Sequence, residues 1–137
     1  MPTGTPGGVG RRGHLQAVDS ICVDINYNDT GAATGIATGK YLPIGGIIIG
    51  TDISVNTTFN AQTTNVLTIG INGTTANNIV ATVSAATAAI VQNYAPTGTA
   101  LGKLTADSQV YVKYTQTGTA ATQGAATFII KYIAVVS

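Results

Sequence analysis

The sequence is short of the residue types that enzymes most often use for chemistry. It has no tryptophan and no glutamate, a single cysteine at Cys22, a single histidine at His14, and only 8% charged residues among 137. A lone cysteine excludes an internal disulfide framework and a multi-cysteine metal site. Nucleophilic catalysis needs an imidazole held by an orienting group, whereas His14 only follows a glycine-rich stretch. We expect a protein that is not an enzyme, with no cofactor, no metal and no small-molecule substrate.

Charge and long apolar runs are equally scarce. The formal net charge is +1 and no basic stripe is present, which argues against nucleic-acid binding. No run of about 18 apolar residues could span a membrane, and the first residues lack the apolar segment of a signal peptide. We therefore expect synthesis in the cytoplasm and no membrane partner. Threonine and asparagine fill the polar positions, so the weakly charged surface favours assembly.

Strand-forming residues dominate what is present. The hydrophobic share is 45%, mostly alanine, valine and isoleucine, and there are 17 glycines. Residues 46–57 show the clearest strand pattern, in which side chains alternate between an apolar and a polar face. The predicted inward side chains are those of Ile47, Ile49, Ile53 and Val55, while Ile48 interrupts the pattern. We expect this strand to be central in its sheet.

Similar patterns predict further strands along the chain. They cover residues 16–27, 40–42, 66–71, 78–83, 100–104, 109–116 and 125–136. Asn72-Gly73 predicts a tight type I′ hairpin turn before the strand at 78–83. The alanine-rich residues 84–92 predict a short helix, because they contain neither glycine nor proline. The last strand is apolar on both faces, so we expect it to be central or covered by another subunit.

Seven to eight short strands joined by glycine-rich turns predict an all-β fold. The expected architecture is an antiparallel β-sandwich, jelly-roll-like, formed by residues 16–137 as a single domain. Residues 1–15 are rich in glycine and proline and contain no apolar pattern. We interpret them as an extended N-terminal arm, since they offer almost nothing to bury.

Four segments of the chain resemble small structural proteins of tailed-bacteriophage virions. They are Leu42-Pro43-Ile44-Gly45, Leu67-Thr68-Ile69-Gly70, Leu104-Thr105-Ala106-Asp107 leading into Val110-Tyr111-Val112, and Gly124-Ala125-Ala126 followed by Tyr132. The resemblance is to jelly-roll-like capsid decoration, cement or head-fibre proteins. It implies a homotrimer on the capsid exterior that contacts the major capsid protein and stabilises the phage head. The alternative is a head-fibre or tail-fibre module that binds host surface glycans through exposed tyrosines (Tyr27, Tyr41, Tyr94, Tyr111, Tyr114 and Tyr132).

The same resemblance makes the N-terminal arm the expected partner-binding segment. Its candidate contact residues are Pro2, Pro6, Val9, Arg11, Arg12 and His14. The two arginines could form bidentate bonds with carboxylates on the shell.

Three apparent ligand motifs are rejected or kept only as weak alternatives. Residues 8–13 match G-x-G-x-x-G but lack the preceding strand and following helix of a dinucleotide site. Residues 35–40 approach a P-loop, yet Tyr41 stands where serine or threonine should bind magnesium. A weak surface calcium at Asp24, Asn28 or Asp29 remains open. For Asp52, the sequence predicts a structural ion pair with Lys113 or Lys131.

Overall fold

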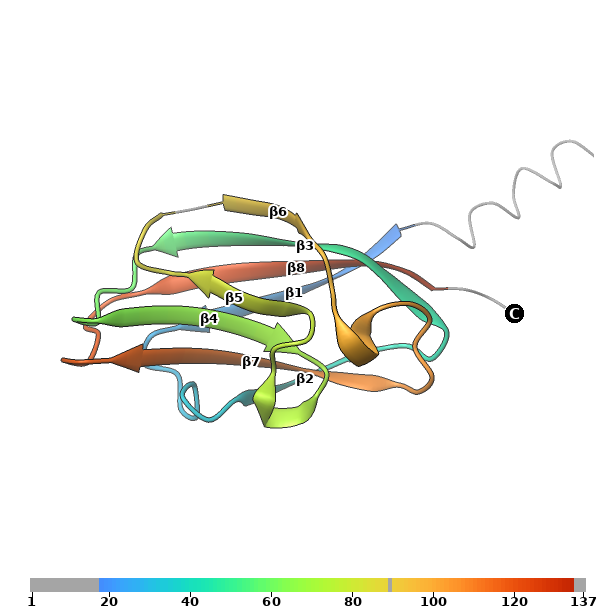
Figure 1. The fold of residues 1–137 in the computed structure, drawn as a ribbon, viewed down its shortest axis with the longest axis horizontal. Helices are drawn as coiled ribbons and strands as arrows, with labels where there is room; N and C mark the ends of the chain where they lie inside the picture. Colours follow the sequence, from blue (N-terminus) through green and yellow to red (C-terminus); the bar gives the residue numbers. More distant parts are fainter. Residues whose placement is uncertain (1–17, 89, 135–137) are drawn as a thin grey trace, which may run out of the picture.

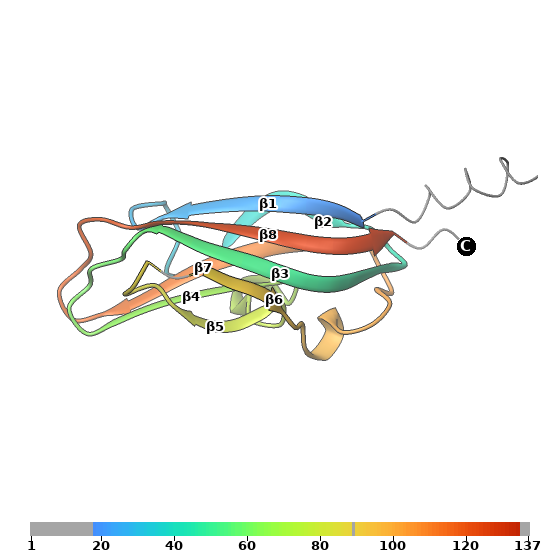
Figure 2. The same ribbon diagram turned by 90° about the horizontal axis from the view of Figure 1, so that it is seen from above.

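The computed structural model describes residues 18–88 and 90–134, which form two packed four-stranded sheets (Figures 1 and 2). One sheet has the order β1-β8-β3-β6 and the other β2-β7-β4-β5. Every strand pairing is antiparallel. The strands are β1 Val18–Asn26, β2 Ile36–Leu42, β3 Gly46–Thr57, β4 Thr64–Gly70, β5 Val80–Ser84, β6 Ile90–Tyr94, β7 Ser108–Thr117 and β8 Ala125–Ala134. The predicted antiparallel β-sandwich of seven to eight strands is confirmed, with eight strands in the structure.

The pairing follows a nested order. Strand β1 pairs with β8, β2 with β7, β3 with β6 and β4 with β5, as in one long hairpin. Rolling that hairpin up adds the β3–β8 and β4–β7 pairs, which complete the two sheets. This nested order of eight strands in two sheets is that of a jelly roll.

The two ends of the sandwich differ in what they carry (Figure 1). The β2–β3, β4–β5 and β6–β7 connections lie at one end, together with Val18 and Ala134, the first and last described residues. We call this the terminal end. The other four connections lie at the opposite end, which we call the loop end.

A continuous apolar core fills the space between the sheets. It follows the alternation expected of half-buried strands, so that Ile21, Val23 and Ile25 of β1 face inward as predicted. Phe128 and Ile130 do the same on β8. Full burial of each such side chain contributes about 1.5–3 kcal/mol. Both β3 and β8 lie inside their sheet, which confirms the predicted central positions.

A β-bulge changes the predicted inward face of β3. Ile48 is opposite Tyr132 on β8, but the next β8 residue, Lys131, is opposite Gly50, so Ile49 is an extra residue. An extra residue reverses the alternation. Ile48 is therefore only 5% exposed and Ile49 is 45% exposed. The prediction that Ile47 and Ile49 point inward is wrong, whereas Ile53 and Val55 are buried as predicted.

The connection between β4 and β5 is longer than a tight hairpin. Asn72 has φ −95° and Gly73 φ +68°, so the pair does not form a type I′ turn, which needs positive φ at both residues. A 3-10 turn over Gly73–Thr75 follows instead. The side chain of Asn78 stabilises this loop, because its Oδ1 accepts a 2.8 Å hydrogen bond from the Ile71 N–H.

Two further predictions are wrong around β6. No helix forms over residues 84–88, and β6 occupies Ile90–Tyr94. Val91 pairs with Ile53 of β3 and packs against the core, so tertiary packing overrides the helix propensity of the alanines. The strand expected at 100–104 is a 3-10 turn over Gly98–Ala100 followed by one bridge between Lys103 and Ile47.

Strand β2 starts earlier than predicted, at Ile36 instead of residue 40.

Candidate interaction surface

The outer face of the β1-β8-β3-β6 sheet carries exposed apolar side chains. Val18 is opposite Ile133, which is opposite Ile47, so these three form a row across the sheet near the terminal end. Ile49 and Ile129 are exposed on the same face, and Ile90 at its edge is 74% exposed. We call Val18, Ile47, Ile49, Ile90, Ile129 and Ile133 the apolar face.

The opposite outer face, on the β2-β7-β4-β5 sheet, is of a different character. Its exposed positions are mainly small or hydroxyl-bearing, among them Ala37, Thr64, Thr82, Ser84, Thr115 and Thr117. Tyr41 is the only large hydrophobic side chain classed as exposed on this face among the described residues. Apolar contact area is therefore concentrated on one side of the sandwich, which is the usual sign of a protein–protein contact surface.

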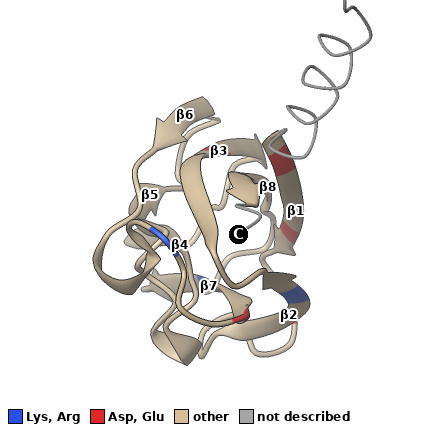
Figure 3. Cartoon of the chain, turned by 90° about the vertical axis from the view of Figure 1, so that its right-hand side faces the viewer, with Lys and Arg blue, Asp and Glu red and all other residues tan. Residues whose placement is uncertain are grey.

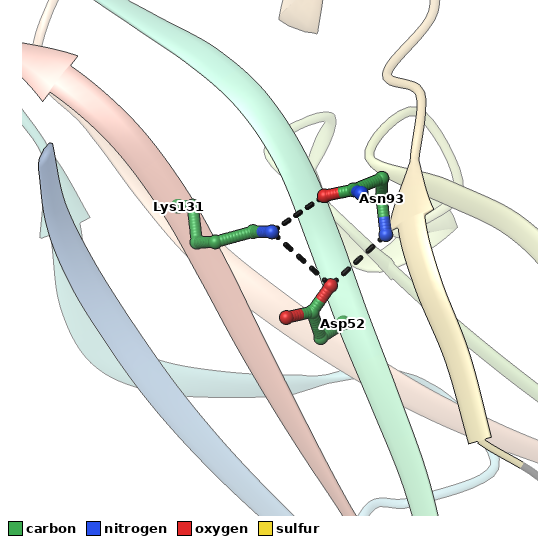
Figure 4. A network of polar contacts seen from close by, with 3 residues as sticks. All are labelled: Asp52, Asn93 and Lys131. Atoms are coloured by element: carbon green, nitrogen blue, oxygen red, sulfur yellow. Dashed lines mark hydrogen bonds and ion pairs between the residues drawn. The ribbon is translucent and has the colours of Figure 1, made fainter.

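Charges on the apolar face are already paired within the chain (Figure 4). Lys131 Nζ lies 3.3 Å from Asp52 Oδ1, which confirms the predicted ion pair with Lys131; Lys113 belongs to the other sheet. The Asn93 N–H donates a 2.9 Å hydrogen bond to the same carboxylate oxygen, and Lys131 also donates to Asn93 Oδ1. The backbone hydrogen bond from Asn93, aided by Lys131, holds the pKa of Asp52 below its usual range.

A second polar row on this face is also satisfied internally. Thr127 Oγ1 donates to Asp24 Oδ1 at 2.7 Å, and Asn56 Nδ2 donates to Thr127 Oγ1 at 3.0 Å. Ser54 Oγ completes the row by donating to Asn56 Oδ1 at 2.9 Å. Because these groups have partners, a protein covering the face need not leave them unpaired, which would cost about 1–3 kcal/mol for each buried group.

The terminal end adds a second group of exposed apolar side chains. Tyr41, Ile44 and Leu101 are all more than half exposed. Tyr41 lies in β2, and the loops that carry Ile44 and Leu101 are tied together, because the Ile44 N–H donates to Asp107 Oδ1 at 2.8 Å and Leu104 exchanges backbone bonds with residues 45–46. Figure 3 shows this end mostly free of charged residues. The terminal end therefore presents apolar side chains on hydrogen-bonded loops.

The predicted arm residues Pro2, Pro6, Val9, Arg11, Arg12 and His14 all lie outside the described residues. Cys22 is exposed on the outer side of β1. In the described part of the chain, no group of three or more histidine, cysteine, aspartate or glutamate side chains could hold a metal ion. The same residues include no helix long and apolar enough to cross a membrane.

The tyrosines do not form an exposed cluster in the described structure. Tyr114 is 1% exposed and its burial raises the pKa of the phenol. Tyr27, Tyr94, Tyr111 and Tyr132 are half-buried, and only Tyr41 is exposed. Burial, with help from the nearby Asp19 charge, also raises the pKa of Tyr132. The exposed aromatic surface expected of a glycan-binding module is therefore reduced to one side chain.

Sequence reasoning missed most of the apolar face, for identifiable reasons. The alternation predicts Ile49 inward, because no sequence signal locates the bulge, and the alanine-rich stretch predicts a helix that would include Ile90. Ile129 could be anticipated, since residues 125–136 are apolar on both faces and only one face can reach the core.

Comparisons with known proteins find the fold but no sequence family. No family model matches the chain, and no curated protein matches it. A similar solved chain comes from the cyanophage Pam1 capsid asymmetric unit, with 16% identity over 88% of this chain and 86% of that chain. A second comes from the capsid of Helicobacter pylori bacteriophage KHP30, with 12% identity over 86% of this chain and 89% of that chain. A third comes from the capsid of Ralstonia phage GP4, with 20% identity over 88% of this chain and 86% of that chain. The TM-score is 0.62 in each case. The chain therefore shares the fold of chains found in three phage capsid structures.

Proposed function

We propose that this chain is a structural protein of a bacteriophage virion and has no enzymatic activity. The observation that carries the proposal is the fold likeness to chains of three phage capsid structures, which spans at least 86% of both chains in each comparison. A match over nearly the whole of both chains is more informative than a shared motif.

The finer proposal is a decoration or cement protein on the capsid exterior. It would stabilise the phage head through contacts with the major capsid protein and with its own copies, as a homotrimer. The apolar face and the terminal end supply contact area, and the arm residues 1–15 supply a further partner-binding segment. Specific interfaces bury about 1,200–2,000 Å² in total, and repeated copies on a shell multiply weak contacts.

The proposal is tested by composition and binding. In virions purified from the phage that encodes this sequence, quantitative mass spectrometry should find the chain at a fixed ratio to the major capsid protein. Light scattering of the purified protein should give three times the 13.8 kDa mass of one copy. Absence of the chain from purified virions would overturn the structural role, whereas a monomeric mass would overturn only the trimer.

A further inference from the structure

Strand β1 is nine residues long and is the outermost strand of its sheet, so one side of its backbone has no strand partner among the described residues. Two polar contacts already reach that side, since Lys40 Nζ donates to the Cys22 carbonyl and the Asn26 N–H donates to Asp29 Oδ2. In antiparallel pairing, alternate residues point their backbone groups the same way. Ser20 and Asp24 therefore present their N–H and C=O groups to this edge as well.

A groove of about 500 Å³ runs beside this edge, between β1 and β2. Its apolar lining comes from Val23, Ile36 and Val112, and its polar lining includes Asp24, Asp29, Thr38 and Lys40. Each carboxylate uses one oxygen internally, Asp24 for Thr127 and Asp29 for Asn26. The second oxygen of each carboxylate has no hydrogen-bond partner among the described residues. The groove thus offers a small apolar wall beside the backbone of β1, and its lining includes two aspartates.

The first 17 residues and the rest of the chain carry net charges of opposite sign. Residues 18–137 contain four lysines and five aspartates, a net charge of −1, while Arg11 and Arg12 give residues 1–17 a net charge of +2. Arginine favours bidentate contact with carboxylates. Glycine is frequent around the arginine pair, and small residues let a backbone approach an edge strand closely.

We infer that the N-terminal segment of a second copy adds as a parallel strand to the β1 edge, so that position 10 lies opposite Cys22 and Arg11 and Arg12 contact Asp24 and Asp29. Strand addition of this kind takes its affinity from main-chain hydrogen bonds and its specificity from side-chain pockets. Seventeen residues reach up to about 56 Å when fully extended. The inference rests on the copy-to-copy contacts of the proposed function and names the surfaces that make them.

The register of the arginines favours a second copy over the chain's own segment. A turn at Gly13-His14 would pair Arg12 with Leu15 and Arg11 with Gln16, before β1 begins and eight or more residues short of Asp24. A later turn at Gln16-Ala17 would bring Arg11 opposite Cys22. That dipeptide lacks the glycine, asparagine or aspartate that a two-residue hairpin turn requires.

The native cysteine provides the test, because Cys22 is exposed on the edge strand and is the only cysteine in the chain. Directly paired strands hold Cα atoms at about 4.5–5.5 Å, within the range of a disulfide. Full-length Gly10→Cys, mildly oxidised, should form covalent dimers or larger species on a non-reducing gel, and these should disappear in the Gly10→Cys, Cys22→Ser double variant. Thr3→Cys is the matched control and should cross-link at least several-fold more slowly.

Every outcome of the oxidation experiment decides the inference. A disulfide within one chain would be seen as thiol loss in a species of monomer mass. It would show that β1 binds the chain's own N-terminal segment and not that of a second copy. Equal rates for Gly10→Cys and Thr3→Cys, or no disulfide at all, would overturn docking on β1. Lys40→Met should increase cross-linking, because it frees the Cys22 carbonyl and removes a charge that repels arginine; a decrease would count against this edge. The virion role can fail in mass spectrometry while docking is intact, so the two failures are distinguishable.

Discussion

The phenol of Tyr114 donates a 2.6 Å hydrogen bond to Oδ1 of Asn65 inside the loop end of the sandwich. The same oxygen accepts a 2.9 Å bond from the Ala61 N–H, and Asn65 Nδ2 donates to the Ala61 carbonyl at 3.0 Å. The Tyr114 ring also packs against Phe59, with centroids 4.5 Å apart. A buried polar group and an aromatic pair therefore connect β7 to the β3–β4 connection.

Removing the phenol hydroxyl should weaken the fold modestly. We expect Tyr114→Phe to lower the free energy of unfolding by about 0.5–1.5 kcal/mol, because Asn65 keeps its bonds to Ala61. Asn65→Ala should cost more, since it removes both bonds to the Ala61 backbone and leaves the tyrosine hydroxyl only its longer 3.3 Å contact with Gln116 Oε1. Urea unfolding followed by circular dichroism measures both. The control is Tyr111→Phe, a half-buried tyrosine on the outer face of β7; an equal loss there would contradict the assigned role of Asn65.

A second prediction concerns Gly124, which precedes β8. Its φ is +151° and a Cβ built on it would lie 2.4 Å from a carbon of the Phe59 ring. Gly124→Ala should therefore combine backbone strain with overpacking, each about 1–3 kcal/mol. Gly102→Ala separates the two effects, because Gly102 has φ +83° but nothing within 4 Å of its Cβ position. Equal melting temperatures for the two variants would show that Phe59 does not restrict this site.

The ion pair of Asp52 predicts a pH dependence of stability. Its folded pKa is lowered from 3.8, so the carboxylate contributes stability that is present above the unfolded pKa and is lost as pH falls through the folded value. Wild type should lose stability more steeply than Asp52→Asn as pH falls below about 5. Because both side chains are partly exposed, we expect a small effect that salt reduces further. Parallel stability curves for the two proteins over this range would contradict the prediction.

The apolar face should matter for binding more than for folding. Ile49→Glu places a charge on an exposed position of that face, so it should weaken attachment to capsids at least tenfold, while the melting temperature changes little. Thr115→Glu, on the opposite outer face, is the matched control. Co-sedimentation of purified variants with capsids that lack the protein measures the difference. Equal binding of the two variants would show that the contact surface lies elsewhere on the molecule.

Much of the fold could be predicted from alternation, because one buried face leaves a period of two in the sequence. The strands predicted at 16–27, 46–57, 66–71, 109–116 and 125–136 correspond to β1, β3, β4, β7 and β8 over their described residues, and Asp52 pairs with Lys131 as expected. The exact inward face of β3 could not be predicted. Its bulge at Ile49 depends on pairing with β8, and that information lies about eighty residues further along the chain.

The remaining errors also come from tertiary contacts that override local preference. Asn72-Gly73 is a strong hairpin signal, yet the Asn78 side chain stabilises a wider loop. Residues 90–94 follow an alanine-rich stretch, yet Ile53 provides a strand partner for Val91. The apolar face depends on both β6 and the bulge, so most of the candidate surface became visible only in the folded chain.

A reconstruction of the virion by electron cryomicroscopy tests the central claim most directly. The account predicts one jelly-roll sandwich per copy on the outer surface of the shell, with Ile49, Ile129 and the terminal end against neighbouring protein. It further predicts density for the N-terminal segment of one copy along the β1 edge of another. A virion without this density, or with the apolar face turned to solvent in every copy, would contradict the account.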